Sequence, residues 1–529
     1  MSQARSIERG LPIARAWPWA LAVVGAAVLA TGVVKAWPFT VDDTYITLRY
    51  SRNVAHGLGP TFNATGPRAE GYTTLLWMLV LVVPHVLGLD AVVVAKGLGV
   101  AATFATLVVA ARWAWTEGRS VGDRAGVGAG AGAGVGARRG ADAGAWAGAA
   151  AAMGFAAIPA TAVHAVSGME TALFTLLLTG LFASSADLVR GESRAANRVI
   201  ALALLLGLTR PEGNLAAFVV IAVSAARLPR DRRATLVLRA TAGWVLPIGA
   251  YELWRRGYYG LTFPLPFYVK LATPGLLPGW PDVHDWLRGP PLHFGLLMVP
   301  LLVRPSRSLG PAVAATLVLI AFFVLPQHQM GYDHRYLAPL DPALAVFAGI
   351  GLARLVSWAH GVRPAVANVA AAGMVVLSAS LEAAGSRAVI AGEAAYGDGL
   401  AQAHARLGRD LFALDLPAGR LVISDAGAVP YFSRWWTVDL VGLNDAAIAT
   451  TGRRDPASVL AQRPDVVVLA SPRTDRVEPW DWNTWEPALY DACLEAGFVR
   501  VGLRRFADDY WLWVLAKPGS VPALRLAPQ

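Results

Sequence analysis

Two adjacent acids, Asp42 and Asp43, are the residues of this chain best placed for chemistry. They follow directly after a long apolar stretch, where the chain is expected to leave a membrane. Carboxylates at such a boundary are costly unless they face water, a cation or a cavity, and each raises the pKa of its neighbour. A carboxylate kept there suits a general base that takes a proton from a hydroxyl group. A solvated helix end is the alternative interpretation.

The two acids lead a segment, residues 39–77, that is rich in hydrogen-bonding and aromatic side chains. It reads FTVDDTYITLRYSRNVAHGLGPTFNATGPRAEGYTTLLW. Side chains of this kind can surround a carbohydrate, and the candidates for binding it are Tyr45, Arg49, Tyr50, Asn53, Glu70 and Tyr72. Which of the two acids is the base depends on side-chain direction, because neighbouring residues of one helix point about 100° apart.

Basic residues further along could bind a phosphate, since arginine can bind phosphate with two hydrogen bonds. Arg210 stands between two short apolar runs, and a pair with Glu212 that closes a helix break is its alternative role. Lys270 follows two aromatic residues and could equally anchor the chain at the lipid interface. The further candidates of these loops are Arg255, Arg256, Tyr258, Tyr259 and Arg335, with lipid headgroup contact as the alternative for the first two.

Three more residues complete the candidate set. Glu170 lies where an apolar segment begins, and an acid also favours a helix N-terminus for electrostatic reasons alone. Asp333 and His334 could hold a divalent cation together with Asp42 or Asp43, but no spacing in the sequence demands a metal. The chain has no GxSxG motif, which argues against serine-hydrolase chemistry. No cofactor is therefore assigned.

The elements that must position these residues are membrane helices. The chain is 55% hydrophobic and 16% charged, and its mean hydropathy is +0.46. Apolar residues come in runs of about 15 to 22, which is the length that crosses a bilayer. This excludes a soluble enzyme and a disordered chain, and the single Cys493 excludes a disulfide scaffold. The net charge of +10 is spread over many short loops, which argues against nucleic-acid binding.

We predict an α-helical polytopic membrane protein. The candidate spans lie near 17–37, 74–88, 91–113, 145–165, 169–188, 197–209, 213–227, 235–254, 292–303, 308–327, 338–358 and 364–384. Arginine clusters between them mark cytoplasmic loops, so the N-terminus should lie inside and the C-terminal domain outside. That arrangement requires an odd number of crossings. The segment 74–88 is short and could be re-entrant, which leaves about eleven.

Three regions lie between or beyond the spans. Residues 38–73 form the first outward loop, and the Gly/Ala-rich stretch within 114–144 is expected to be a flexible cytoplasmic loop that runs into a small-residue helix. Residues 389–529 alternate helix and strand patterns, which predicts an extracytoplasmic α/β domain after a membrane domain of residues 1–388. In this C-terminal domain, Trp480, Trp482 and Trp485 could pack in a core or stack on sugars.

The patterns DDxYIxxRYxxN, GxGPxFN and EGYTTxLW in the first loop resemble the GT-C glycosyltransferases related to the actinobacterial terminal β-(1→2)-arabinofuranosyltransferase. Weaker matches are SGMETALF, LTRPEGN, RRGYYGLTFPLPFYVKL, DAGAVPYFS and DLVGLND. The resemblance implies about eleven spans and an extracytoplasmic C-terminal domain in a bacterial plasma membrane. It also implies transfer of a sugar, such as arabinofuranose, from a polyprenyl-phosphate donor to a glycan or lipid acceptor.

Two other functions stay open on the residues alone. A lipid-linked sugar flippase or polar-solute transporter would place ionisable groups near mid-membrane, often within inverted repeats. The sequence shows no such repeat, and its polar motifs lie in outward loops. A structural assembly subunit would make the C-terminal domain an interaction module and the two acids incidental.

Overall fold

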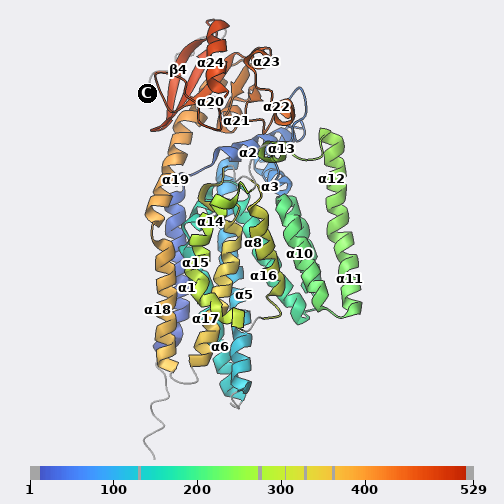
Figure 1. The fold of residues 1–529 in the computed structure, drawn as a ribbon, viewed down its shortest axis with the longest axis vertical. Coiled ribbons are helices and arrows are strands. Elements are labelled where there is room, and N and C mark those ends of the chain that lie inside the picture. Colours follow the sequence, from blue (N-terminus) through green and yellow to red (C-terminus); the bar gives the residue numbers. More distant parts are fainter. Residues whose placement is uncertain are drawn as a thin grey trace, which may run out of the picture.

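Apolar helices build most of the molecule, and a small sheet caps one end of their bundle (Figure 1). The computed structural model describes residues 12–128, 133–271, 277–303, 306–326, 330–359, 364–416 and 418–519. The bundle comprises α1 (Pro12–Ala36), α5 (Ala91–Gly128), α6 (Ala133–Ala157), α7 (Pro159–Val166), α8 (Thr171–Arg190), α9 (Ala195–Thr209), α10 (Pro211–Arg227), α11 (Arg230–Ala240), the π-helical turn η1 (Thr241–Val245), α12 (Leu246–Tyr259), α14 (Trp280–Arg288), α15 (Pro290–Val303), α16 (Gly310–Phe323), α17 (Asp341–Ala359) and α18 (Pro364–Ala383).

Several of these helices are long and apolar enough to cross a bilayer. In the described part of the chain five helices meet this condition, and seven do if each bent pair counts as one span. The bent pairs are α6 with α7, at 66°, and α14 with α15, at 59°. The protein is therefore a multi-pass membrane protein. The number of eleven crossings also counts shorter helices such as α9 and α16, and it stays a prediction.

The Gly/Ala-rich stretch departs from expectation. It was predicted to be a loop over 114–144, but helix α5 continues to Gly128 and α6 begins at Ala133. Small residues allow the two helices to approach closely. A Cβ atom added to Gly118 would lie 2.6 Å from Cβ of Ala147, and one added to Gly144 would lie 2.9 Å from the backbone oxygen of Trp115. Close packing thus outweighs the low helix propensity of glycine.

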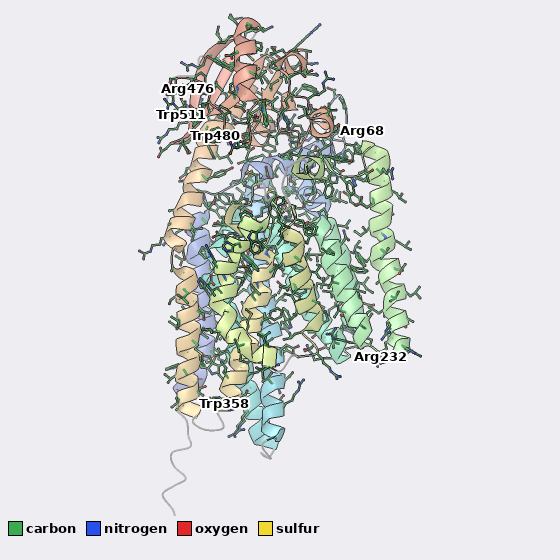
Figure 2. All side chains as sticks on the ribbon, in the orientation of Figure 1. Arg68, Arg232, Trp358, Arg476, Trp480 and Trp511 are labelled. Carbon is green, nitrogen blue, oxygen red and sulfur yellow. The ribbon has the colours of Figure 1, made fainter. Side chains whose placement is uncertain are left out.

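The two ends of the molecule differ in charge and content. Arg232 and Trp358 lie at one end of the molecule. Arg476 and Trp480, in the C-terminal domain, lie at the other end (Figure 2). The arginine-rich turn 227–233 and the C-terminal domain are therefore on opposite sides of the bundle, as the charge pattern predicted. Which side faces the cytoplasm stays a prediction.

Short elements lie between the bundle and the sheet (Figure 1). The segment expected near 74–88 forms two short helices instead of one span. These elements are α2 (Asp42–Ala55), α3 (Leu75–Val80), α4 (Val82–Val86), α13 (Leu265–Leu271), and the single turns η2 (Tyr332–His334) and η3 (Ala338–Leu340).

The C-terminal domain has the predicted α/β character. Its sheet has the order β2-β1-β3-β5-β4, with β1 parallel to β2 and β3, and β5 antiparallel to β3 and β4. Every residue of the central strand β3 is buried. The elements are α19 (Ser386–Leu400), the π-helical turn η4 (Ala401–Ala405), α20 (Arg406–Phe412), β1 (Arg420–Ile423), α21 (Ala428–Ser433), β2 (Trp436–Asp439), α22 (Ala446–Thr451), α23 (Pro456–Leu460), β3 (Val466–Ser471), α24 (Glu486–Glu495), β4 (Val499–Ala507) and β5 (Tyr510–Ala516).

The connection between the two domains is a helix. One helical rod runs from Ala365 to Phe412 and carries the chain from the bundle into the sheet domain. The boundary expected at 388/389 falls inside this rod, just after Gly385, whose φ of 84° marks a local break. The strand β2 was not anticipated from the sequence.

Candidate active site

The two neighbouring acids at the start of α2 point to different surroundings. The carboxylate of Asp42 accepts hydrogen bonds from the backbone N–H groups of Gly427 and Ala428, at 2.9 and 2.8 Å. The carboxylate of Asp43 lies 3.6 Å from Nη1 of Arg335, and its side chain is 24% exposed. Adjacent helix positions diverge by about 100°, so one acid faces the C-terminal domain and the other faces the bundle.

Asp42 holds α2 against the start of α21. Burial raises the pKa of its carboxyl to about 6, while the charge of His404 opposes this shift. The contact requires glycine at position 427, since an added Cβ there would lie 2.1 Å from the backbone oxygen of Asp42. Both carboxylate oxygens are used by backbone amides, which makes Asp42 a structural clamp.

Asp43 belongs to a group of buried charges, the Asp43 cluster, made of Asp43, Glu170, Arg210, Glu212 and Arg335. Oε1 of Glu170 lies 3.5 Å from Nη2 of Arg335 and 3.6 Å from Nε of Arg210. Arg210 also pairs with Glu212 at 2.8 Å, as its alternative role predicted. The structure thus brings together five residues that lie up to 292 positions apart in the chain.

Each member of the Asp43 cluster stands at a helix end or break. Glu170 precedes the first turn of α8, and Arg210 is the extended residue between α9 and α10. Arg335 follows η2, where Asp333 and His334 have φ values of 43° and 54°. Such values cost non-glycine residues roughly 1–3 kcal/mol each. The chain tolerates this strain at the turn that presents Arg335.

Several buried polar atoms of the Asp43 cluster lack a hydrogen-bond partner. Among the described residues, Nη1 of Arg210, Nε of Arg335 and Oε2 of Glu170 have no hydrogen-bond partner although they are buried. Nearly all buried polar groups in proteins are paired. The ring of Tyr336 lies beside both guanidinium groups, at 5.1 and 5.6 Å from their Cζ atoms. Two arginines with open N–H donors next to a part-exposed carboxylate can receive an anionic ligand.

Four candidate residues of the first loop lie outside the Asp43 cluster. They lie in the junction, which is where that loop meets the C-terminal domain. Arg49 donates to the backbone oxygens of Phe62, Pro430 and Trp435. The amide of Asn53 donates to the backbone oxygens of residues 61 and 62, and Tyr50 binds the backbone of residues 69 and 71. Tyr45 packs on Tyr431 and Phe432. These side chains position the loop and do not reach into the Asp43 cluster.

A second group of candidates forms a buried pair nearby. Glu70 accepts a hydrogen bond from Nη1 of Arg255 at 2.9 Å, and burial raises the pKa of Glu70 to about 8. The hydroxyls of Tyr72 and Tyr259 lie 3.1 Å apart. Arg255 was a candidate for phosphate binding, with headgroup contact as its alternative, but it forms an internal ion pair in which both side chains are 3% exposed.

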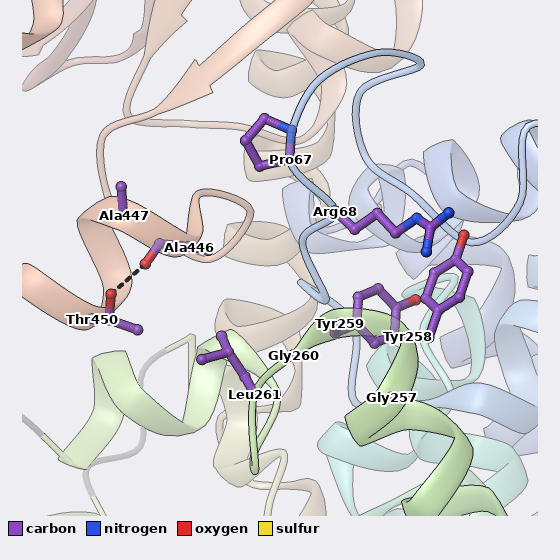
Figure 3. A pocket seen from close by; sticks show the side chains of 10 residues that line it. All are labelled: Pro67, Arg68, Gly257, Tyr258, Tyr259, Gly260, Leu261, Ala446, Ala447 and Thr450. Carbon is purple, nitrogen blue, oxygen red and sulfur yellow. Dashed lines mark hydrogen bonds between the residues drawn. The ribbon is translucent and has the colours of Figure 1, made fainter.

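An open cavity of about 560 Å³ lies beside this pair, between the first loop, the end of α12 and α22 (Figure 3). Tyr258 lines it, under the guanidinium of Arg68, whose Cζ lies 4.2 Å from the ring centroid. Lys270 lies in α13, but its side chain is outside the described residues.

The turn that precedes Arg335 offers no metal site. The backbone oxygen of Asp333 contacts Nε2 of His164 at 3.1 Å, and Nδ1 of His334 lies 2.7 Å from the carboxylate of Asp282. Across the described ranges, three or more His, Cys, Asp or Glu residues nowhere gather in a way that could hold a metal ion. The cation considered for Asp333 and His334 has no ligand set here.

Comparisons with known proteins agree on the architecture. ArnT from Cupriavidus metallidurans, solved with undecaprenyl phosphate bound, superposes with a TM-score of 0.61 over 97% of this chain and 99% of its own, at 15% identity. Its apo structure gives 0.59. The chain has the GT-C fold.

Sequence comparison covers less of the chain. Residues 395–514 match a family described as a domain of unknown function, DUF8728. The terminal β-(1→2)-arabinofuranosyltransferase of Mycobacterium tuberculosis is 30% identical over 266 residues, which is 47% of this chain. The chain spans 38% of that relative's length.

Three residues that contact one another in the C-terminal domain were not among the candidates from the sequence. Oδ2 of Asp425 is contacted by Nε2 of His404 at 2.9 Å and by the hydroxyl of Tyr510 at 2.6 Å. Asp425 opens the quoted motif DAGAVPYFS, which gave a signal. A lone histidine on a helix and a tyrosine in an aromatic strand gave none, because their pairing depends on how the sheet docks on α19.

Proposed function

We propose that this protein is a membrane glycosyltransferase that moves a sugar from a polyprenyl-phosphate donor to a glycan or lipid acceptor. The observation that carries the proposal is the Asp43 cluster: a part-exposed carboxylate beside two buried arginines with open N–H donors. The GT-C fold supports it, as does ArnT, whose solved complex holds undecaprenyl phosphate. Arabinofuranose is the proposed sugar, because the mycobacterial relative is named as its transferase.

Arg210 and Arg335 bind the donor phosphate in this proposal. The two residues are 4% and 7% exposed. Hydrogen bonds between arginine and phosphate gain strength away from water. Glu170 lies between the two arginines, offsets their mutual repulsion and fixes their spacing. A phosphate would then take the open donors Nη1 of Arg210 and Nε of Arg335.

Asp43 is the general base, and Asp42 keeps α2 in place. Asp42 has both oxygens bound to backbone amides, so neither oxygen is open to an acceptor hydroxyl. Asp43 accepts the proton of the acceptor hydroxyl, whose oxygen attacks the anomeric carbon from the side opposite the phosphate. The bond from that carbon to the phosphate oxygen breaks, polyprenyl phosphate leaves with the electron pair, and the sugar configuration inverts. Positioning plus one base supplies the rate enhancement.

The site faces the outer side of a bacterial plasma membrane in this proposal. The arginine-rich turn at the opposite end of the bundle (Figure 2) supports it, since such turns stay in the cytoplasm. A sugar donor used on the outer side is lipid-linked in this proposal. This agrees with a site located where the bundle meets the C-terminal domain.

The test is transfer by purified protein in nanodiscs, with a radiolabelled polyprenyl-phosphate arabinofuranose and an arabinofuranose oligosaccharide. We expect a labelled saccharide product without any ion gradient or partner protein. Inactivity with this donor, accompanied by movement of the labelled lipid between leaflets of a vesicle, would refute a transferase and support a flippase.

A further inference from the structure

Two tryptophans of the C-terminal domain lie outside its hydrophobic cores. Trp482 is 42% exposed and Trp480 is half-buried. Neither belongs to a core cluster of the described residues, whereas Trp485 packs against one. Of the two roles considered for these residues, core packing therefore holds for Trp485 and not for the other two.

The rings of Trp482 and Trp480 stack on each other, and Trp480 also stacks on the ring of Tyr510. The centroids of the two indole rings are 5.8 Å apart at 13°, and Trp480 lies 4.8 Å from Tyr510 at 23°. We call Trp482, Trp480 and Tyr510 the outer aromatic stack. Parallel rings with an exposed outer face suit the apolar C–H face of a sugar ring.

A fixed carboxylate lies at the base of the outer aromatic stack. Asp425 receives the Tyr510 hydroxyl and His404 on Oδ2, while its side chain is 21% exposed. No hydrogen bond to Oδ1 is formed by any described residue. The carboxylate is thus oriented by two partners and keeps one oxygen for an outside donor, which is how a protein accepts a sugar hydroxyl.

Aromatic rings continue from the outer aromatic stack to the Asp43 cluster. Successive ring centroids are 5.0, 5.0, 5.7 and 5.2 Å apart along the row Tyr510, Phe506, Tyr396, Phe39 and Tyr332. The ring of Tyr332 lies 5.9 Å from Cζ of Arg335. Phe39 is 1% exposed, and all four contacts are edge-to-face. The row is therefore interior packing, which fixes the outer aromatic stack relative to the Asp43 cluster.

We propose that the outer aromatic stack and Asp425 form an acceptor subsite for a neutral oligosaccharide, remote from the sugar that reacts at Asp43. The stack supplies the apolar contact, and Asp425 accepts hydroxyl hydrogen bonds. The inference rests on the proposed function and names its acceptor as a chain of several sugars instead of a single sugar or a lipid headgroup.

Kinetics with acceptors of two lengths tests the subsite. Trp482→Ala and Trp480→Ala are compared with wild type on a linear arabinofuranose hexasaccharide and on methyl arabinofuranoside. We expect KM for the hexasaccharide to rise about tenfold, as loss of a stacking contact requires, with kcat unchanged. KM for the monosaccharide glycoside should not move. Trp482→Phe should restore most of the hexasaccharide affinity.

Trp358→Ala is the matched control, because Trp358 is 77% exposed and lies at the opposite end of the molecule (Figure 2). An unchanged hexasaccharide KM in both stack variants overturns the subsite. So does an equal loss on both acceptors, which indicates general damage.

A binding measurement keeps this inference separate from the proposed function. Calorimetric titration of the hexasaccharide into the Asp43→Asn protein reports affinity without turnover. Binding to this protein that is lost on adding Trp482→Ala supports the subsite even if wild type transfers no sugar, in which case only the proposed function fails. Transfer by wild type without measurable hexasaccharide binding overturns the subsite alone.

Discussion

Two groups of buried charges lie close together where the bundle meets the C-terminal domain, and they are paired in different ways. In the junction, Asp42 and Arg49 bind backbone groups of residues 427–435 through nearly every polar atom they have. In the Asp43 cluster, distances between opposite charges reach 3.6 Å, and several N–H and carboxylate atoms have no partner in the described structure.

The same contrast holds for a buried acid within the C-terminal domain. Asp439 accepts hydrogen bonds from the backbone N–H groups of Val441, Gly442 and Asn444 and from the Asn444 side chain. Burial nevertheless raises the pKa of Asp439 to about 7. A saturated buried charge fixes one conformation, whereas an unsaturated one costs free energy that only a ligand recovers. Saturation, more than burial, therefore separates the charges of the junction from those of the Asp43 cluster, for which we propose a role in transfer.

The largest expected effect separates the two neighbouring acids. Asp43→Asn should lower the transfer rate by about 10² to 10⁴, because a general base contributes that much, while the protein still folds. Asp42→Asn should lower it by about tenfold or less, because one amide hydrogen bond is lost and the clamp loosens. Initial rates with the labelled donor measure both. Loss of transfer in Asp42→Asn but not in Asp43→Asn would reverse the assignment.

A donor-specific effect should follow from Arg335→Lys. Lysine keeps the charge but loses the planar fork that binds phosphate. We expect KM for the polyprenyl-phosphate donor to rise about ten- to hundredfold, in line with hydrogen bonds to charged groups. KM for the acceptor should stay constant. A fall in kcat at unchanged donor KM would show that Arg335 acts on Asp43 instead of on the phosphate.

Arg49→Met should act on stability and leave donor affinity unchanged. It removes a buried cation and leaves three backbone oxygens without their donor. The expected loss is about 3 kcal/mol in the free energy of unfolding, measured by thermal unfolding in detergent micelles. Arg476→Met is the matched control, because its pair with Glu478 is exposed and contributes less than about 1 kcal/mol. Equal losses in the two variants would contradict the role of the junction.

The sequence allowed the fold to be predicted and singled out Asp42 and Asp43, since both depend on local patterns. Apolar runs predict spans, and adjacent acids on one helix must diverge. The choice between Asp42 and Asp43 could not be made, because it depends on the backbone amides of residues 427 and 428, about 385 positions away. The partners of Arg49 were hidden for the same reason, since backbone carbonyl groups carry no side-chain signature.

The prediction of a loop for the Gly/Ala-rich stretch was wrong for a different reason. Glycine-rich composition favours a loop when local propensity decides, but two helices that pack through small residues gain more from close contact than they lose in propensity. Arg255 shows the converse case. Its place in an outward basic segment indicated phosphate binding or a headgroup contact, and only the fold shows Glu70 within reach.

The smallest expected effect is the pH dependence that Asp42 gives to the junction. Burial raises the pKa of Asp42 from 3.8 to about 6 in the folded protein. Between these values the folded form holds a proton that the unfolded form has released, so the contribution of Asp42 to stability falls as the pH rises through this window.

The wild-type unfolding temperature should therefore drop between about pH 4 and pH 6, and Asp42→Asn should lose that part of the slope because it cannot titrate. Equal slopes in the two proteins would remove Asp42 from the titration. The same two proteins then sharpen the comparison of the acids. If Asp42 is a clamp, its titration changes stability and leaves the pH profile of kcat unchanged. A kcat profile that shifts in Asp42→Asn would instead place Asp42 in the chemistry.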